Sequence, residues 1–176
     1  GPVGQRQGSL ESMVTSPDIW RGRRVLITGH TGFKGGWLAL WLAQRGARVT
    51  GLALEPPTKP SLFEVARVGT GIDSRIGDIR SFDTMRETFA AAKPEVVLHM
   101  AAQPIVRLSY EDPVGTYATN VMGTVHVLEA ARRAGLVTTS TKPAGAAMVG
   151  ARTGSGEVVE PHRVPREDRV PLGARW

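Results

Sequence analysis

The chain has 176 residues, of which 41% are hydrophobic, and this size and composition are typical of one folded domain with a tail. It contains no cysteine, which excludes disulfides and thiolate nucleophiles or metal ligands, and we expect no metal site. No apolar run approaches the ~18 residues of a membrane span and no signal-peptide pattern is present, so we expect a cytoplasmic protein.

The formal charge of +6 raises the question of nucleic-acid binding. The basic residues are scattered, however, and their densest cluster, Arg21, Arg23 and Arg24, directly precedes a predicted strand. Aromatic residues make up only 6% of the chain and do not alternate with cations as they would on a base-stacking surface. We therefore interpret the charge as solvated surface charge and expect no nucleic-acid or membrane partner.

The chain divides into three parts. Residues 1–17 are polar and show no hydrophobic period, as in a disordered leader or a vector-derived extension in front of a start at Met13. In residues 18–135 short apolar runs alternate with segments of helical spacing, which predicts a parallel sheet with helices on both faces, a Rossmann-type doubly wound α/β fold. Strands are predicted at 25–27, 49–54, 75–79 and 95–102, and helices at 37–45, 62–68, 81–92 and 113–134.

The third part, residues 136–176, has a different composition. It contains nine glycines or prolines, and no stretch keeps a strand or helix period. Residues 136–139 are a candidate for a short fifth strand, so we expect the sheet to be truncated after about four or five strands and the rest of the tail to be irregular. One hypothesis is that the tail is read out of frame; the alternative is a genuine short protein with a divergent tail.

A glycine pattern connects the first predicted strand to the first predicted helix. Gly29, Gly32 and Gly35 form Gly-x-x-Gly-x-x-Gly, which suits a tight turn that approaches a pyrophosphate closely at a helix N-terminus. The alternative is three turn glycines without a ligand. The strand before the pattern and the helix after it favour a dinucleotide-binding turn.

Two carboxylates lie at the ends of the second and third predicted strands, and Asp78 and Ile79 end the third. Glu55 lies twenty residues after Gly35, where it would bind the adenosine ribose and disfavour a 2′-phosphate, which favours NAD over NADP; the alternative is a solvated acid beside Lys59. Asp78 would meet the adenine amino group, or it would cap the next helix. Small residues, Ala101 and Ala102, end the fourth strand, where bulk would block the dinucleotide.

Seven motifs extend this interpretation. They are Thr28-Gly-His-Thr-Gly-Phe-Lys-Gly35, Pro60-Ser-Leu-Phe-Glu64, Ile76-Gly-Asp-Ile-Arg80, Lys93-Pro-Glu95, His99-Met-Ala-Ala-Gln-Pro104, Arg107-Leu-Ser-Tyr110 and Thr119-Asn-Val-Met-Gly-Thr124. Together they closely resemble the N-terminal half of the CDP-glucose 4,6-dehydratase family of extended short-chain dehydrogenases/reductases, over about residues 18–135.

The resemblance implies an NAD-dependent lyase. NAD would take hydride from C4 of CDP-glucose, water would leave across C5 and C6, and the hydride would return to C6. Arg107 would line the approach to the substrate, although a surface role is equally expected for it, and the helix 113–134 would mediate a homodimer. The residues implied to contact NAD are Gly29, His30, Gly32, Phe33, Lys34, Gly35, Glu55, Asp78, Ile79, Ala101, Ala102, Gln103 and Asn120.

The chain departs from the family at its catalytic residues. The family uses a Tyr-x-x-x-Lys pair, in which lysine lowers the pKa of a tyrosine base, but Tyr110 and Tyr117 are each followed four residues later by valine. Ser140 and Lys142 stand where the family has Thr-Ser-Asp-Lys, without the acid, and are only weak catalytic candidates. We therefore expect this polypeptide to be inactive alone; the alternative function is a non-catalytic NAD-binding module.

Overall fold

The computed structural model describes residues 19–136, 139–142 and 146–151, and the side chains of 19–136. Its strands form one sheet with the order β3-β2-β1-β4-β6-β5. They are β1 (Arg24–Thr28), β2 (Arg48–Ala53), β3 (Asp73–Ile76), β4 (Val96–His99), β5 (Thr139–Lys142) and β6 (Ala146–Ala151). Strands β3, β2, β1 and β4 are mutually parallel, which confirms the predicted doubly wound parallel arrangement.

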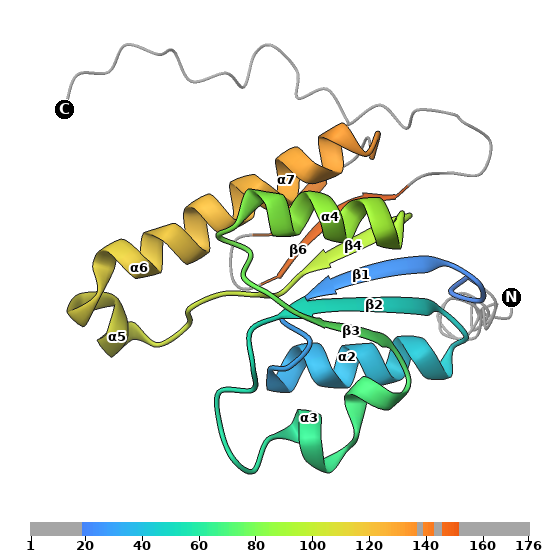
Figure 1. Ribbon diagram of the computed structural model, residues 1–176, viewed down its shortest axis with the longest axis horizontal. Helices are drawn as coiled ribbons and strands as arrows, with labels where there is room; N and C mark the ends of the chain where they lie inside the picture. Colours follow the sequence, from blue (N-terminus) through green and yellow to red (C-terminus); the bar gives the residue numbers. More distant parts are fainter. Residues whose placement is uncertain (1–18, 137–138, 143–145, 152–176) are drawn as a thin grey trace, which may run out of the picture.

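Helices cover both faces of this sheet (Figure 1). In chain order the helical segments are α2 (Phe33–Gln44), α3 (Leu62–Val65), the 3-10 turn η1 (Val68–Thr70), α4 (Phe82–Ala92), α5 (Val106–Glu111), α6 (Pro113–Tyr117), the π-helical turn η2 (Ala118–Met122) and α7 (Gly123–Arg133). In Figure 1, α2 and α3 lie on one side of the strands and α4 and α7 on the other. No helix within the described residues is long and apolar enough to cross a membrane.

The core has two halves, because successive side chains of a strand point to opposite faces. Val25 and Ile27 of β1 pack in one buried cluster with Leu42 of α2, whereas Leu26 packs in the other with Met85 of α4 and Val127 of α7. Hydrophobic side chains on both faces of β1 are what a central parallel strand requires.

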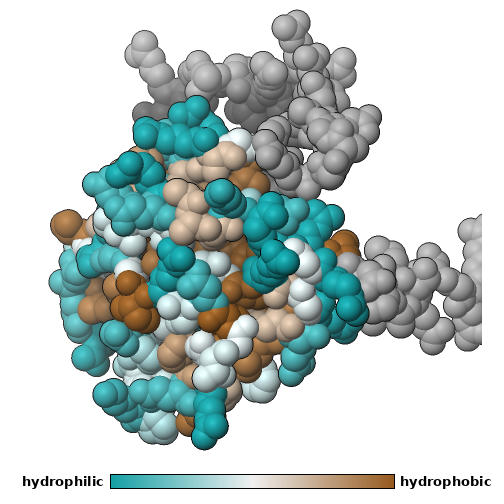
Figure 2. Space-filling view, turned by 45° about the vertical axis from the view of Figure 1, so that its right-hand side comes forward, coloured by the Kyte–Doolittle hydropathy of each residue, from teal (hydrophilic) through white to brown (hydrophobic). Residues whose placement is uncertain are grey.

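The outer surface differs from this core. On the face shown in Figure 2, hydrophobic residues lie in separate patches interrupted by hydrophilic ones.

Several element boundaries differ from the sequence-based expectation. Strand β3 ends at Ile76, so Asp78 follows the strand and does not end it. The helical run 113–134 contains the π-helical turn η2, which separates α6 from α7. A further helix, α5, precedes that run.

The tail contributes more structure than predicted. The sequence predicts one short strand at 136–139 and an irregular remainder, whereas β5 begins at Thr139 and β6 occupies 146–151. Strand β6 pairs antiparallel with β4, and β5 pairs antiparallel with β6. The composition concealed these strands, because β6 is built largely from alanine and glycine, which carry little strand propensity.

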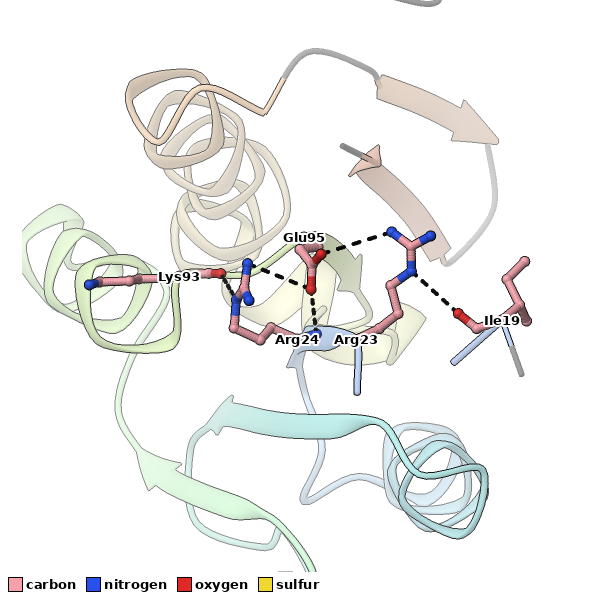
Figure 3. A network of polar contacts seen from close by, with 5 residues as sticks. All are labelled: Ile19, Arg23, Arg24, Lys93 and Glu95. Atoms are coloured by element: carbon pink, nitrogen blue, oxygen red, sulfur yellow. Dashed lines mark hydrogen bonds and ion pairs between the residues drawn. The ribbon is translucent and has the colours of Figure 1, made fainter. Parts of the chain in front are cut away.

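One polar network joins the starting ends of β1 and β4 (Figure 3). The carboxylate of Glu95 accepts a hydrogen bond from the backbone N–H of Arg24 at 2.9 Å and lies 3.6 Å from the Arg24 guanidinium and 3.9 Å from that of Arg23. The Arg24 Nε also donates to the carbonyl of Lys93 at 2.6 Å. These contacts hold the entry of β4 against the entry of β1.

Candidate functional site

The turn between β1 and α2 is shaped by two glycines that have no room for a side chain. Gly29 has φ +83°, and a Cβ on it would lie 2.7 Å from the backbone nitrogen of Ala101. A Cβ on Gly35 would overlap the carbonyl oxygen of Gly29. The backbone N–H of Gly29 also donates to the carbonyl of Leu52 at 2.8 Å. The turn is therefore pressed against both neighbouring strands.

Gly32 differs from these two glycines. A Cβ on it would meet only the Gly29 carbonyl oxygen, at 3.4 Å, which is ordinary van der Waals contact. Gly32 is the N-cap of α2 and provides no side-chain cap for the first-turn N–H groups, which carry the positive end of the helix dipole. The fold itself does not require glycine at this position. An anion that approaches the N-terminus of α2 would require it, because a side chain at residue 32 would obstruct the approach.

His30 lies beneath the turn. Its side chain is completely buried, and its ring fills the space that a Cβ on Gly51 would occupy. Its Nε2 is hydrogen-bonded to Ser74 Oγ at 2.7 Å, and its ring meets Phe63 edge-on with 5.5 Å between centroids. Burial lowers the pKa of His30, and the backbone of Leu52 opposes this more weakly.

The neutral imidazole of His30 has its Nδ1 buried without a hydrogen bond of good geometry. Because this side chain faces β2 and β3, only the backbone of His30 remains in the turn to meet a ligand.

The two carboxylates expected around an adenosine are positioned differently. Glu55 is exposed two residues after β2. Asp78 is only partly exposed, and its carboxylate accepts hydrogen bonds from the backbone and side chain of Arg80. The cap of α4 is Ser81, whose hydroxyl accepts from the N–H of Thr84. Asp78 therefore does not cap this helix, which was the alternative role for it.

A directed chain of hydrogen bonds lies where β1 and β4 end. Thr28 Oγ1 accepts from the backbone N–H groups of Met100 at 3.1 Å and Ala101 at 3.2 Å, so its own proton is free to point to Nδ1 of His99, 2.6 Å away. This leaves the proton of His99 on Nε2, which donates to Thr124 Oγ1 at 3.1 Å. Thr124 in turn donates to the carbonyl of Asn120 at 2.6 Å.

His99 is neutral in this chain, because burial lowers its pKa. A protonated ring would turn a second donor toward Thr28 Oγ1, which already receives two N–H groups. The network therefore fixes both the charge and the tautomer of His99.

Asn120 holds the segment that follows β4 through hydrogen bonds to its backbone. Its Oδ1 accepts from the backbone N–H of Gln103 at 2.8 Å, and its Nδ2 donates to the carbonyl of the same residue at 3.0 Å. The side chain of Gln103 donates to Thr116 Oγ1 at 2.9 Å. Asn120 sits in the π-helical turn η2, and such turns often occur at functional sites. Asn120 and Gln103 thus join the segment after β4 to α6 and η2.

The remaining predicted residues fall into distinct environments. Phe33 and Lys34 are exposed at the start of α2, and Ala101 and Ala102 follow β4. Ile79 is a core residue, and its side chain would collide with a Cβ on Gly123, so only its backbone can face a ligand.

The substrate and catalytic candidates lie outside this group. Arg107 projects from α5 with 88% of its side chain exposed and pairs with Glu111 at 3.0 Å, as a surface residue does. Ser140 and Lys142 belong to β5, whose side chains are outside the described part of the structure.

Sequence reasoning assigned no role to Thr28, His99, Thr124 or Arg80. For the first two a signal existed, since polar residues at equivalent ends of adjacent buried strands pair directly in the sheet, as Thr28 and His99 do.

A cavity of about 610 Å³ lies elsewhere, between α4 and α7, and reaches Arg24 and Glu95. These residues mark the starting ends of β1 and β4. Ligands of open parallel sheets bind beyond the carboxyl ends of the strands, so we place the candidate site at the glycine turn and not in this cavity.

Known proteins resemble the part of the chain that contains this turn. Residues 26–147 match the family model described as GDP-mannose 4,6 dehydratase. The chain is 59% identical over 118 residues to a CDP-glucose 4,6-dehydratase of Salmonella typhimurium, which covers 67% of this chain and 33% of that protein. The chain thus spans about a third of the length of this relative.

Solved structures show the same fold. The UDP-glucose 4-epimerase of Thermus thermophilus, in complex with NAD, has a TM-score of 0.57 and 29% identity, over 69% of this chain and 41% of the epimerase. The UDP-glucose 4-epimerase of Thermotoga maritima, with UDP-glucose, has a TM-score of 0.58 and 26% identity, over 64% and 35%. By its match to the family model over most of its length, the chain belongs to the GDP-mannose 4,6 dehydratase family.

Proposed function

We propose that the turn between β1 and α2 binds NAD and that this chain is the cofactor-binding part of a nucleotide-sugar 4,6-dehydratase acting on CDP-glucose. The observation that carries the proposal is Gly32, which gives the N-terminus of α2 no side-chain cap although a Cβ there would meet only the Gly29 carbonyl oxygen, at 3.4 Å. The 59% identity to a CDP-glucose 4,6-dehydratase supports the substrate class. An NAD-bound epimerase with the same fold supports the cofactor.

Different residues of the site would bind the successive parts of NAD. The backbone N–H groups that follow Gly32 would hold the pyrophosphate. Glu55 would accept hydrogen bonds from the ribose hydroxyls, and its charge would repel the additional phosphate of NADP. Asp78 would face the adenine. Bound NAD would supply a hydride acceptor, and Ala101 and Ala102 would leave room for the nicotinamide half.

The catalytic pair of the family is not found among the 176 residues, because valine stands four positions after each tyrosine. Both tyrosines are also highly exposed, Tyr110 at 83% and Tyr117 at 69%. We therefore expect the purified 176-residue polypeptide to bind NAD without converting CDP-glucose. Formation of CDP-4-keto-6-deoxyglucose by this polypeptide would refute that expectation.

The test of the cofactor site is a matched pair of glycine substitutions. Gly32→Ala adds a methyl group that the fold tolerates but a pyrophosphate would not, so calorimetry should show loss of NAD binding with an unchanged Tm in the absence of ligand. Gly71→Ala is the control, since a Cβ there meets nothing within 4 Å. Unchanged NAD affinity in Gly32→Ala would contradict the proposed site.

The cofactor preference is tested at Glu55. Wild-type protein should be stabilised against thermal unfolding by NAD more than by NADP at equal concentration, and Glu55→Gln should narrow this difference because the repelling charge is removed. An equal response to the two cofactors in wild type would remove the assigned role of Glu55.

We also propose that the chain forms a homodimer through the helical run 113–134. Large apolar side chains are exposed along it and along α5, including Val114 at 79%, Tyr117 at 69% and Val106 at 70%. Water would leave this surface on association, which is favourable. Tyr117→Glu should shift sedimentation toward the monomer, whereas Val65→Glu, at an equally exposed position on α3, should not. A monomeric wild type would refute the dimer.

A further inference from the structure

We infer that Thr31 is a positioning residue whose buried hydroxyl holds the segment that carries Glu55, so that the preference for NAD over NADP depends on Thr31 as well as on Glu55. This inference rests on the proposed function, because it assumes that Glu55 faces the adenosine ribose of a dinucleotide bound at the glycine turn. It adds the residue that keeps this carboxylate in place.

Thr31 connects the glycine turn to the exit of β2 through its side chain. It lies in the turn between Gly29 and Gly32, and only 6% of its surface is exposed. Its Oγ1 donates to the backbone carbonyl of Leu54 at 2.9 Å. Leu54 directly precedes Glu55, so this hydrogen bond fixes the backbone one residue before the carboxylate.

The bond from Thr31 continues the hydrogen-bonding pattern at the end of β2. The N–H of Gly29 donates to the carbonyl of Leu52, and the N–H of Gly77 donates from the β3 side to the carbonyl of Ala53, both at 2.8 Å. Successive carbonyls are thus used alternately by the two neighbouring segments, and the carbonyl of Leu54 is the next one that faces the glycine turn. There the hydroxyl of Thr31 takes the place of a backbone N–H.

Side-chain packing does not hold the segment that follows. No residue from 54 to 60 is buried, and Leu54 is 56% exposed. The next buried position is Ser61, which is the N-cap of α3. The segment is therefore anchored at its start by the hydroxyl of Thr31 and at its end by Ser61. Without this hydroxyl the carbonyl of Leu54 would lose its donor, and Glu55 would be free to move away from the turn.

The charge of Glu55 discriminates between the cofactors only if the carboxylate stays close to the ligand. The repulsion between a carboxylate and the additional phosphate of NADP falls with distance, and salt screens it over about 8 Å at physiological ionic strength. Because Glu55 is exposed, water and counterions would fill the space between a displaced carboxylate and this phosphate. A fixed backbone at Leu54 is therefore a condition for the selectivity.

The experiment measures the dissociation constants of NAD and NADP by calorimetry on the 176-residue chain at pH 7. Wild type should prefer NAD by about tenfold or more, since NADP would place like charges side by side. Thr31→Val has nearly the shape of threonine but no hydroxyl, and it should reduce the preference to about threefold or less, because a displaced charge is screened. Thr31→Ser retains the hydroxyl and should keep the wild-type preference.

Two comparisons separate positioning from a general structural effect. Thr88→Val is the matched control, because Thr88 is also buried and its hydroxyl also donates to a backbone carbonyl, that of Thr84 at 2.8 Å; it should keep the preference. The effects of Thr31→Val and Glu55→Gln should not add, so that Glu55→Gln changes the preference by less than about twofold once Thr31 is replaced. If Thr31→Val does not fold, Thr31→Ala takes its place.

The outcomes separate the levels of the proposal. Absence of NAD binding by wild type would overturn the proposed function. Equal binding of NAD and NADP by wild type would overturn the role of Glu55 and, with it, that of Thr31. Variants without the hydroxyl that keep the wild-type preference, whether or not they bind both dinucleotides more weakly, would overturn the role of Thr31 alone.

Discussion

The packing of His30 into the space above Gly51 makes Gly51→Ala a strong test of how the glycine turn is supported. Gly51 lies in the middle of β2, paired with Ile27 of β1 on one side and Ser74 of β3 on the other. A Cβ on Gly51 would fall among the atoms of the His30 imidazole. The ring has no free space into which it can move, because it is completely buried and is held by Ser74 and Phe63.

The expected cost follows from these contacts. Overpacking a buried site costs about 1–3 kcal/mol, and displacing the ring from Ser74 forfeits a hydrogen bond worth about 1 kcal/mol. We therefore expect Gly51→Ala to lower the free energy of unfolding by about 2–4 kcal/mol. For a domain of this size, Tm falls by about 4 °C for each kcal/mol.

The assay is a double-mutant cycle in urea, followed by far-ultraviolet circular dichroism. His30→Ala alone should destabilise the protein by about 2–4 kcal/mol, because it leaves a cavity. In the His30→Ala background, however, Gly51→Ala should be nearly neutral, since the added methyl group enters that cavity. The coupling energy between the two substitutions should therefore be about 2 kcal/mol or more. Additive costs, within about 0.5 kcal/mol, would refute the assignment of His30 to this space.

Three further predictions concern the buried histidines and the entry of β4. Burial lowers the pKa of both His30 and His99, so the unfolded chain binds protons first on acidification. The free energy of unfolding should be level above pH ~6.5 and fall below it by up to about 1.4 kcal/mol per pH unit for each histidine; a constant value from pH 7 to pH 5.5 would contradict this. Thr124→Val removes the acceptor of His99 Nε2 and should cost about 1–3 kcal/mol in urea unfolding, whereas an unchanged midpoint would mean that His99 has another partner. Glu95→Gln retains an oxygen for the N–H of Arg24 but loses the charge, so it should cost only about 0.5–1 kcal/mol, and that cost should shrink in 1 M NaCl; a loss that is independent of salt would point to packing instead.

The parts of the fold that the sequence predicted are those with a local signal. The apolar run of β1, the glycines after it and the helical spacing of α2 are contiguous, and each element constrains the next. Ser81 was recognisable as a helix cap for the same reason, since its partner Thr84 is only three residues away. The π-helical turn η2 leaves no such signal, because the apolar spacing of the run 113–134 continues through it.

Strands β5 and β6 were poorly predicted for a different reason. They are placed by antiparallel pairing with each other and with β4, and not by their own hydrophobic period. Their pairing partners therefore decided the strand assignment in a segment that reads as irregular.

Two site features depended entirely on tertiary contact. His30 belongs to the glycine motif by sequence, but its side chain turns away from the motif because Gly51, twenty-one residues later, leaves room for it. The chain from Thr28 through His99 to Thr124 joins residues that lie far apart in sequence.

The sequence by itself therefore determined that a buried parallel strand leads through a glycine turn into a helix, because those requirements are local and few residue types satisfy them. Only the tertiary structure decided which side chains support that turn and which remain available to a ligand. Burial and hydrogen-bond capacity are properties of the surrounding residues, and for His30 and Asp78 the decisive neighbours come from packing and from the geometry of the adjacent turn.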